Sequence, residues 1–112
     1  MNTLNINIKN EVIIASFVGV DYFNNQNYII IKDQIEEIVK NHNTTLILDF
    51  SNIIHFDAST FCALTINLRT AKRHNSKFIL TNLSDRLTEV VKVMNLNRVF
   101  TIYSTVDEFF EI

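Results

Sequence analysis

The sequence predicts an α/β fold with an N-terminal β-hairpin, then alternating strands and helices, forming a four- to five-stranded mixed sheet with about four helices packed on it. Leu4, Ile6 and Ile8 alternate with asparagines, which is the two-residue period of a strand. The apolar runs at 46–48 and 78–80 show little alternation, which is typical of parallel strands covered on both faces. Apolar residues at helical spacing separate these runs, and strands that alternate with helices favour a mixed sheet.

The N-terminal half is expected to hold the hairpin and one helix. A polar turn at 9–11 joins the first strand to a second at 12–18, which Gly19 ends. Residues 21–27 form a polar connection. The next segment has one apolar face at helical spacing, with charged residues elsewhere. The residues of that face are Tyr28, Ile31, Ile35, Ile38 and Val39.

The C-terminal half is expected to alternate strands with helices. Residues 57–59 cap a second helix, which Asn75 ends, and Ser84 caps a third. Residues 99–102 form the last strand, and Thr105 with Glu108 has the pattern of a capping box for a terminal helix. The inward residues of the second helix are Phe61, Leu64, Leu68 and Ala71, and those of the third are Leu87, Val90, Val91 and Met94.

Asparagine takes the place of glycine at the expected turns. The chain has one Gly and no Pro, so positions that need a positive φ must use another residue. Asn tolerates that conformation better than most residues, because its short amide satisfies nearby backbone groups. We expect Asn10, Asn43, Asn75 and Asn95 to act in this way. A compositional bias of the genome would give the same pattern.

Composition restricts the classes of function. The 112 residues fit a single domain over 1–112, and 47% apolar residues suffice for a core. A net charge of −2 and a pI near 5.8 do not favour nucleic-acid binding. No apolar run is long enough for membrane insertion, and the N-terminus lacks the pattern of a signal peptide. The lone Cys62 cannot form an internal disulfide, which suits a cytoplasmic location.

No catalytic, metal or cofactor site is predicted. His42, His55 and His74 share no metal-ligand spacing with Cys62 or with paired carboxylates. A single Gly rules out a glycine-rich phosphate loop. Cys62 falls in the expected first turn of the second helix, where the reactive thiolate is favoured. The preferred interpretation of Cys62 is a small, partly buried hydrophobe.

The segment Phe56–Phe61 is the most unusual local feature. An apolar stretch runs into Asp57 and then into two hydroxyl side chains at an expected helix start. A helix N-terminus carries free N–H groups and partial positive charge, so it tolerates an anion such as a phosphoryl group. An ordinary helix cap is the alternative interpretation, and the pattern alone favours it.

Several short motifs follow one another from Leu46 onward. They are Leu48–Ser51, Phe56–Phe61, Arg69–Leu80, Leu83–Ser84, Met94–Phe100 and Thr105–Glu108. Each motif is weak alone, but their order and spacing are specific and cover nearly the whole chain. With these motifs the chain resembles the STAS domain family, as found in bacterial anti-sigma factor antagonists.

The chain departs from the family pattern at the usual phosphorylation site. The serine that follows the aspartate in these antagonists is Ala58 here, which has no hydroxyl. Ser59 matches the family's second hydroxyl position, and Thr60 stands where Gly is usual. The N-terminal family signature keeps Gly19, but Asp21 comes one place early.

The resemblance implies a non-catalytic docking protein in a partner-switching pathway, whose partner is an anti-sigma factor or serine-kinase-like protein. With Ala58 at the usual site, such a protein would be constitutively competent, or regulated at Ser59 or Thr60, or by other means. Ile66 is either an interface anchor or a filler at the edge of the core. The expected partner-binding residues are His55, Asp57, Ala58, Ser59, Thr60, Cys62, Ile66 and Arg69.

Two other functions stay open. Some STAS domains are accessory subunits of ABC-type lipid transporters, in which the partner is the transporter ATPase, and the loss of the phosphoacceptor suits that role equally. The third is a small enzyme or nucleotide-binding protein, which the lack of a glycine loop or a metal cluster disfavours. Calorimetry with ATP and GTP would detect it.

Overall fold

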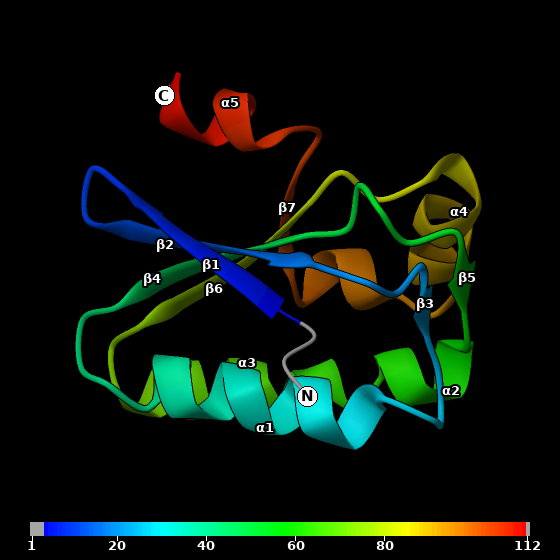
Figure 1. Ribbon diagram of the computed structural model, residues 1–112, viewed down its shortest axis with the longest axis horizontal. Helices are drawn as coiled ribbons and strands as arrows, with labels where there is room; N and C mark the ends of the chain where they lie inside the picture. Colours follow the sequence, from blue (N-terminus) through cyan, green and yellow to red (C-terminus); the bar gives the residue numbers. More distant parts are fainter. Residues whose placement is uncertain (1–3, 112) are drawn as a thin grey trace.

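A five-stranded mixed sheet in the order β1-β2-β4-β6-β7 lies at the centre of the computed structural model, which describes residues 4–111 (Figure 1). β1 and β2 are antiparallel, and the other neighbouring pairs are parallel. This topology confirms the predicted fold class. The strands are β1 (Leu4–Lys9), β2 (Val12–Phe17), β4 (Thr45–Asp49), β6 (Lys77–Thr81) and β7 (Thr101–Tyr103).

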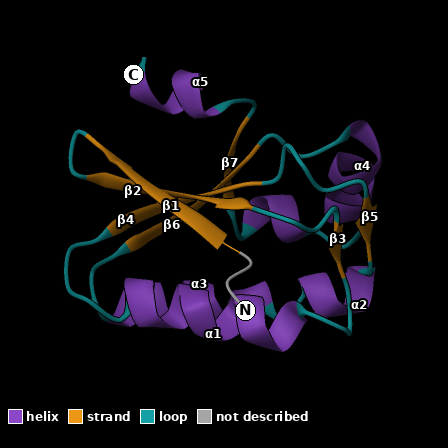
Figure 2. Ribbon diagram, viewed as in Figure 1, coloured by secondary structure: helices purple, strands orange, loops and turns teal. Residues whose placement is uncertain are grey.

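Helices cover both faces of this sheet (Figure 2). α1 (Tyr28–Val39) and α3 (Leu64–Arg73) lie side by side on one face, and α5 (Val106–Phe110) lies over the other. The central strand β4 is therefore enclosed, and Leu46, Ile47 and Leu48 have no exposed surface. α4 (Asp85–Val93) and the short 3₁₀ helix η1 (Leu96–Arg98) lie between β6 and β7 along the chain.

The predicted helix caps are present. The Ser84 hydroxyl accepts the Leu87 N–H at 3.1 Å, and the Thr105 hydroxyl accepts the Glu108 N–H at 3.0 Å. The Glu108 carboxylate in turn accepts the Ser104 N–H at 2.8 Å. The capping box thus satisfies donors on both sides of the start of α5.

The predicted left-handed asparagines are confirmed. Asn10, Asn43, Asn75 and Asn95 have φ of 51°, 61°, 56° and 59°. Two further non-glycine residues of the described chain have a positive φ that was not predicted, namely Glu11 at 67° and Asn82 at 59°.

Three segments differ from the predictions. Residues 21–27 contain β3 (Tyr22–Phe23), which pairs in parallel with β5 (His55–Phe56) in a second, two-stranded sheet. The last strand begins at Thr101, because η1 precedes it. The expected second helix is divided into α2 (Ala58–Phe61) and α3, with Cys62 and Ala63 between them.

The division between α2 and α3 has a local cause. Around it the backbone makes tighter i→i−3 bonds, in which Ala63 and Thr65 donate to Thr60 and Cys62, both at 3.0 Å. The Thr65 hydroxyl also donates to the Cys62 carbonyl at 2.7 Å, and so competes with the ordinary helical bond. α2 is consequently a separate turn with an opening of its own.

Phe61 anchors α2 in the core. Its ring has no exposed surface and meets Phe23, Phe50 and Phe100, with centroids 6.5, 5.7 and 6.1 Å away. Aromatic pairs at these distances favour the tilted and edge-to-face arrangements seen here. The opening of α2 is thus held on a rigid aromatic base.

Candidate functional site

The small β3–β5 sheet positions the segment that leads into α2. The N–H groups of Ile54 and His55 both donate to the Asp21 carbonyl, at 2.8 and 3.0 Å. The Asp57 N–H donates to the Phe23 carbonyl at 3.0 Å. These bonds fix the backbone on both sides of β5, so Asp57 enters α2 from a defined direction.

Asp57 caps α2, as predicted. Its backbone is extended, with φ −113° and ψ 120°. One carboxylate oxygen, Oδ1, accepts both the Ser59 N–H at 3.0 Å and the Ser59 hydroxyl at 2.9 Å. Asp57 thus satisfies one of the free N–H groups of the helix start and orients the neighbouring hydroxyl.

The two hydroxyl residues at this turn have different environments. Ser59 is exposed, whereas Thr60 is only 8% exposed. The Thr60 hydroxyl points back and donates to the Asp57 carbonyl at 2.9 Å. Ala58 is half-buried beside them. The accessible hydroxyl of the turn is therefore that of Ser59.

Cys62 lies at the end of α2 rather than in the first turn of a longer helix, because the helix is divided there. The expected place of Cys62 in the first turn of one longer helix is therefore wrong, since Cys62 lies between α2 and α3. The side chain is half-buried and packs against the core, which confirms its interpretation as a small hydrophobe.

Ile66 and Arg69 extend the site along α3. Both side chains are exposed, that of Ile66 to 44%. The adjacent Asn67 is fully buried and ties α3 to α1, since its amide donates to the Lys32 carbonyl at 3.0 Å and to the Glu36 carboxylate at 2.9 Å.

The structure places the predicted residues along one continuous path from β5 through α2 to α3. Two neighbours of that path were missed. Ile54 is 64% exposed directly before His55, and the guanidinium of Arg86 on α4 lies 5.8 Å from the centroid of the Phe56 ring. The position of Ile54 in an apolar run concealed its exposure, and no sequence signal connects Arg86 with this segment.

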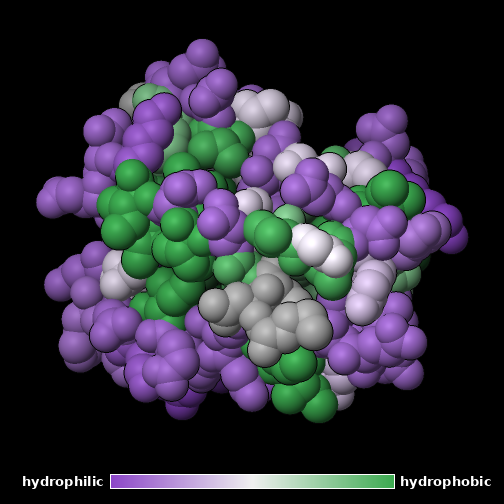
Figure 3. Space-filling view, viewed as in Figure 1, coloured by the Kyte–Doolittle hydropathy of each residue, from purple (hydrophilic) through white to green (hydrophobic). Residues whose placement is uncertain are grey.

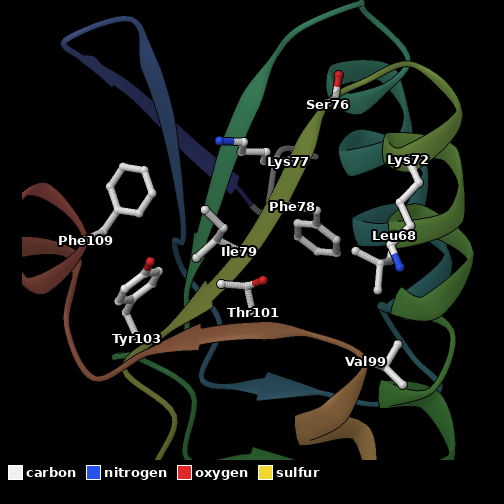
Figure 4. A pocket seen from close by; sticks show the side chains of 10 residues that line it. All are labelled: Leu68, Lys72, Ser76, Lys77, Phe78, Ile79, Val99, Thr101, Tyr103 and Phe109. Atoms are coloured by element: carbon white, nitrogen blue, oxygen red, sulfur yellow. The ribbon is translucent and has the colours of Figure 1, made fainter. Parts of the chain in front are cut away.

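A groove of about 400 Å³ lies elsewhere, beside the first residues of β6 (Figure 4). Tyr103 and Phe109 lie on one side of that strand and Leu68 and Lys72 on the other. None of the predicted partner-binding residues lines this groove.

Neither a metal-ligand cluster nor a membrane-spanning helix is present among the described residues. Between Leu4 and Glu111, no three His, Cys, Asp or Glu side chains are grouped so that they could hold a metal ion. No helix within these same residues has the length and apolar character needed to cross a membrane.

The fold matches those of solved structures, and a family model matches most of the chain. A family model described as the STAS domain matches residues 3–109. An anti-sigma-factor antagonist (STAS) domain protein from Planctomyces limnophilus is 18% identical, with a TM-score of 0.83 over 94% of this chain and 92% of that one. A putative anti-sigma factor antagonist from Thermotoga maritima is 19% identical, with a TM-score of 0.79 over 96% and 92%. The anti-sigma factor antagonist SpoIIAA in its unphosphorylated form is 15% identical, with a TM-score of 0.66 over 94% and 91%.

Proposed function

Because this chain belongs to the STAS domain family, we propose that it is a non-catalytic docking protein, similar to anti-sigma factor antagonists, that binds an anti-sigma factor or serine-kinase-like protein in a partner switch. The observation that carries the proposal is the exposed opening of α2, where Asp57 orients the accessible Ser59. The structural neighbours named as anti-sigma factor antagonists support it.

The docking surface in this proposal follows the path from β5 to α3. His55, Ser59, Ile66 and Arg69 offer exposed side chains for contact with a partner. Asp57, Ala58 and Cys62 are half-buried and set the shape of the surface between them, whereas the buried Thr60 supports the turn from inside. A surface that combines an apolar anchor with a few charged and polar groups suits recognition of a folded protein.

Ser59 is the proposed phosphoacceptor, since Ala58 has no hydroxyl and that of Thr60 is turned inward. A phosphate on Ser59 would replace a hydrogen-bond donor with about 1.5 to 2 negative charges beside the Asp57 carboxylate. Two unit charges about 4 Å apart at a protein surface repel by about 4 kcal/mol. A helix N-terminus stabilises a nearby negative group by only about 0.3–1 kcal/mol, so the repulsion is the larger effect. The modification would therefore disturb the Asp57 cap and the docking surface together.

Affinity purification from the source organism tests the docking role. The unmodified chain and Ser59→Ala are expected to capture the same anti-sigma factor or kinase-like protein, and Ser59→Asp is expected to lose it. Val93→Lys, on the exposed side of α4, is the control and should retain capture. A transporter ATPase in the eluate would instead favour the alternative of a transporter accessory subunit, to which the absence of a hydroxyl at Ala58 is equally suited.

Phosphorylation is tested separately. The chain is incubated with the captured kinase and ATP, and the modified residue is located by mass spectrometry. Phosphate on Ser59 is expected, and Ser59→Ala should abolish it. Phosphate on a residue outside Ser59 and Thr60 would defeat the proposed regulation at this turn.

A further inference from the structure

The outer edge of β1 is a free sheet edge within residues 4–111, since β1 stands at the end of the strand order. Proteins usually protect such edges with charges, Pro, bulges or a covering element, because a free edge pairs readily with another strand. β1 contains neither Pro nor Gly, and Lys9 at its end is its one charged residue. This edge therefore lacks the usual protection.

The hairpin turn determines which backbone groups face that edge. Asn10 and Glu11 form a two-residue turn with both φ values positive, as a type I′ turn requires. The pair that flanks such a turn, Lys9 and Val12, is hydrogen-bonded, and bonded pairs alternate with non-bonded pairs along the hairpin. Asn5, Asn7 and Lys9 therefore bond to β2. The N–H and C=O groups of Leu4, Ile6 and Ile8 point outward.

By strand alternation the side chains of those same three residues lie on one face of the sheet, and Leu4 and Ile6 line a groove beside α1. Leu4 is 8% exposed, but Ile6 is 45% exposed and Ile8 is 71% exposed. A groove of about 240 Å³ lies between this end of β1 and α1, and Ile38 contributes to its lining. Hydrophobic atoms gather over the β1–β2 hairpin on the face shown in Figure 3. The free edge thus combines outward backbone groups with exposed isoleucines.

We propose that a second copy of this chain occupies the edge, with the two β1 strands antiparallel across a two-fold axis at Ile6. The strand reads alike in both directions about Ile6, because apolar residues stand at 4, 6 and 8 and asparagines at 5 and 7. In this register Ile6 faces Ile6 of the partner subunit, and Leu4 faces Ile8 of the partner subunit. Each of these facing pairs has outward N–H and C=O groups and exchanges two hydrogen bonds.

The same register buries the exposed side chains. Ile8 of the partner subunit comes opposite Leu4, over the groove between β1 and α1. On the other face Asn5 stands opposite Asn7 of the partner subunit, so that two amides meet and no like charges are opposed. If the partner strand were shifted by two residues, Leu4 would face the hairpin turn of the partner subunit. Leu4 would then lose the two hydrogen bonds of its facing pair. The edge lies apart from α2 and β5, so the proposed docking site stays uncovered (Figure 1).

Sedimentation tests the dimer. We expect a reversible dimer whose dissociation constant lies between about 10 µM and 1 mM. Ile8→Lys is expected to raise this dissociation constant at least about tenfold. Val93→Lys makes the same kind of change at an 80% exposed position on α4 and should leave dimerisation unchanged. A chain that stays monomeric up to about 1 mM, or a dimer that Ile8→Lys does not weaken, would overturn the proposal. Circular dichroism verifies that each variant is folded.

Cross-linking tests the register. In a Cys62→Ala background, Ile6→Cys places two thiols opposite each other, within the Cα separation of about 4.4–6.8 Å that a disulfide spans. Ile8→Cys places its two thiols several residues apart along the paired strands. Under mild oxidation Ile6→Cys should form a disulfide-linked dimer and Ile8→Cys should not. Equal cross-linking of both variants, or of neither, contradicts the two-fold axis at Ile6.

Discussion

Replacing Asp57 with Ala tests whether α2 depends on its cap. The variant removes the acceptor of the Ser59 N–H and of the Ser59 hydroxyl, while the buried Phe61 keeps the turn in place. Loss of such a cap costs about 1 kcal/mol. With an unfolding entropy of about 2.1 cal/mol/K per residue, a chain of 112 residues has about 0.24 kcal/mol/K, so the midpoint of thermal unfolding should fall by about 4 °C.

Two matched variants identify the interaction that is lost. Asp57→Asn keeps an acceptor oxygen and should lose less than half as much stability, because the dipole of the four-residue α2 is small. Ser59→Ala removes only the hydroxyl bond, so the double variant with Asp57→Ala should cost less than the sum of the single changes. Calorimetry and urea titration measure all of them. If Asp57→Asn proved as costly as Asp57→Ala, charge rather than hydrogen bonding would hold the turn.

Further variants test other parts of the fold by urea denaturation. Phe61→Ala should cost about 3–5 kcal/mol, because it empties the centre of the aromatic cluster, and a loss below about 1 kcal/mol would contradict that role. Asn67→Ala should cost about 2 kcal/mol, since it removes the two hydrogen bonds that the Asn67 amide donates to part-buried acceptors on α1. Arg69→Ala, on the exposed side of α3, should change stability by less than about 0.5 kcal/mol. Asn95→Ala should cost about 1 kcal/mol and Asn95→Gly almost nothing, a pattern that equal losses would disprove.

Most of the central sheet follows from local sequence patterns. Leu46–Leu48 lacks alternation and is buried on both faces, as that pattern indicates. The cap at Ser84 and the turn at Asn75 depend on side chains that act within a few residues of their own position, so short segments contain the information.

Pairings between distant segments could not be predicted. β3 and β5 have two residues each, too few to show a period, and their pairing depends on the Asp21 carbonyl receiving two N–H groups from residues 54 and 55.

The division between α2 and α3 depends on Thr65, whose hydroxyl competes for a carbonyl only once the turn has formed. Apolar spacing alone continues through that division and so predicts one helix.

Within the candidate site, the cap was predictable and the orientation of the hydroxyls was not. Asp57 before a hydroxyl residue is a local signal of a helix start. Ser59 and Thr60 look equivalent as neighbours in sequence, but one step along a helix rotates a side chain by about 100°, which turns one outward and the other inward. Arg86 comes from another helix, and only the folded chain brings it to Phe56.

The left-handed asparagines affect the denatured chain as much as the native one. A glycine at each of these turns would relieve the native backbone, yet it would also give the denatured ensemble more conformations to lose on folding. Asn narrows that ensemble at Asn10, Asn43, Asn75, Asn82 and Asn95. Since the sequence has no proline, its refolding should also lack the slow phase of about 10–100 s that prolyl isomerisation imposes.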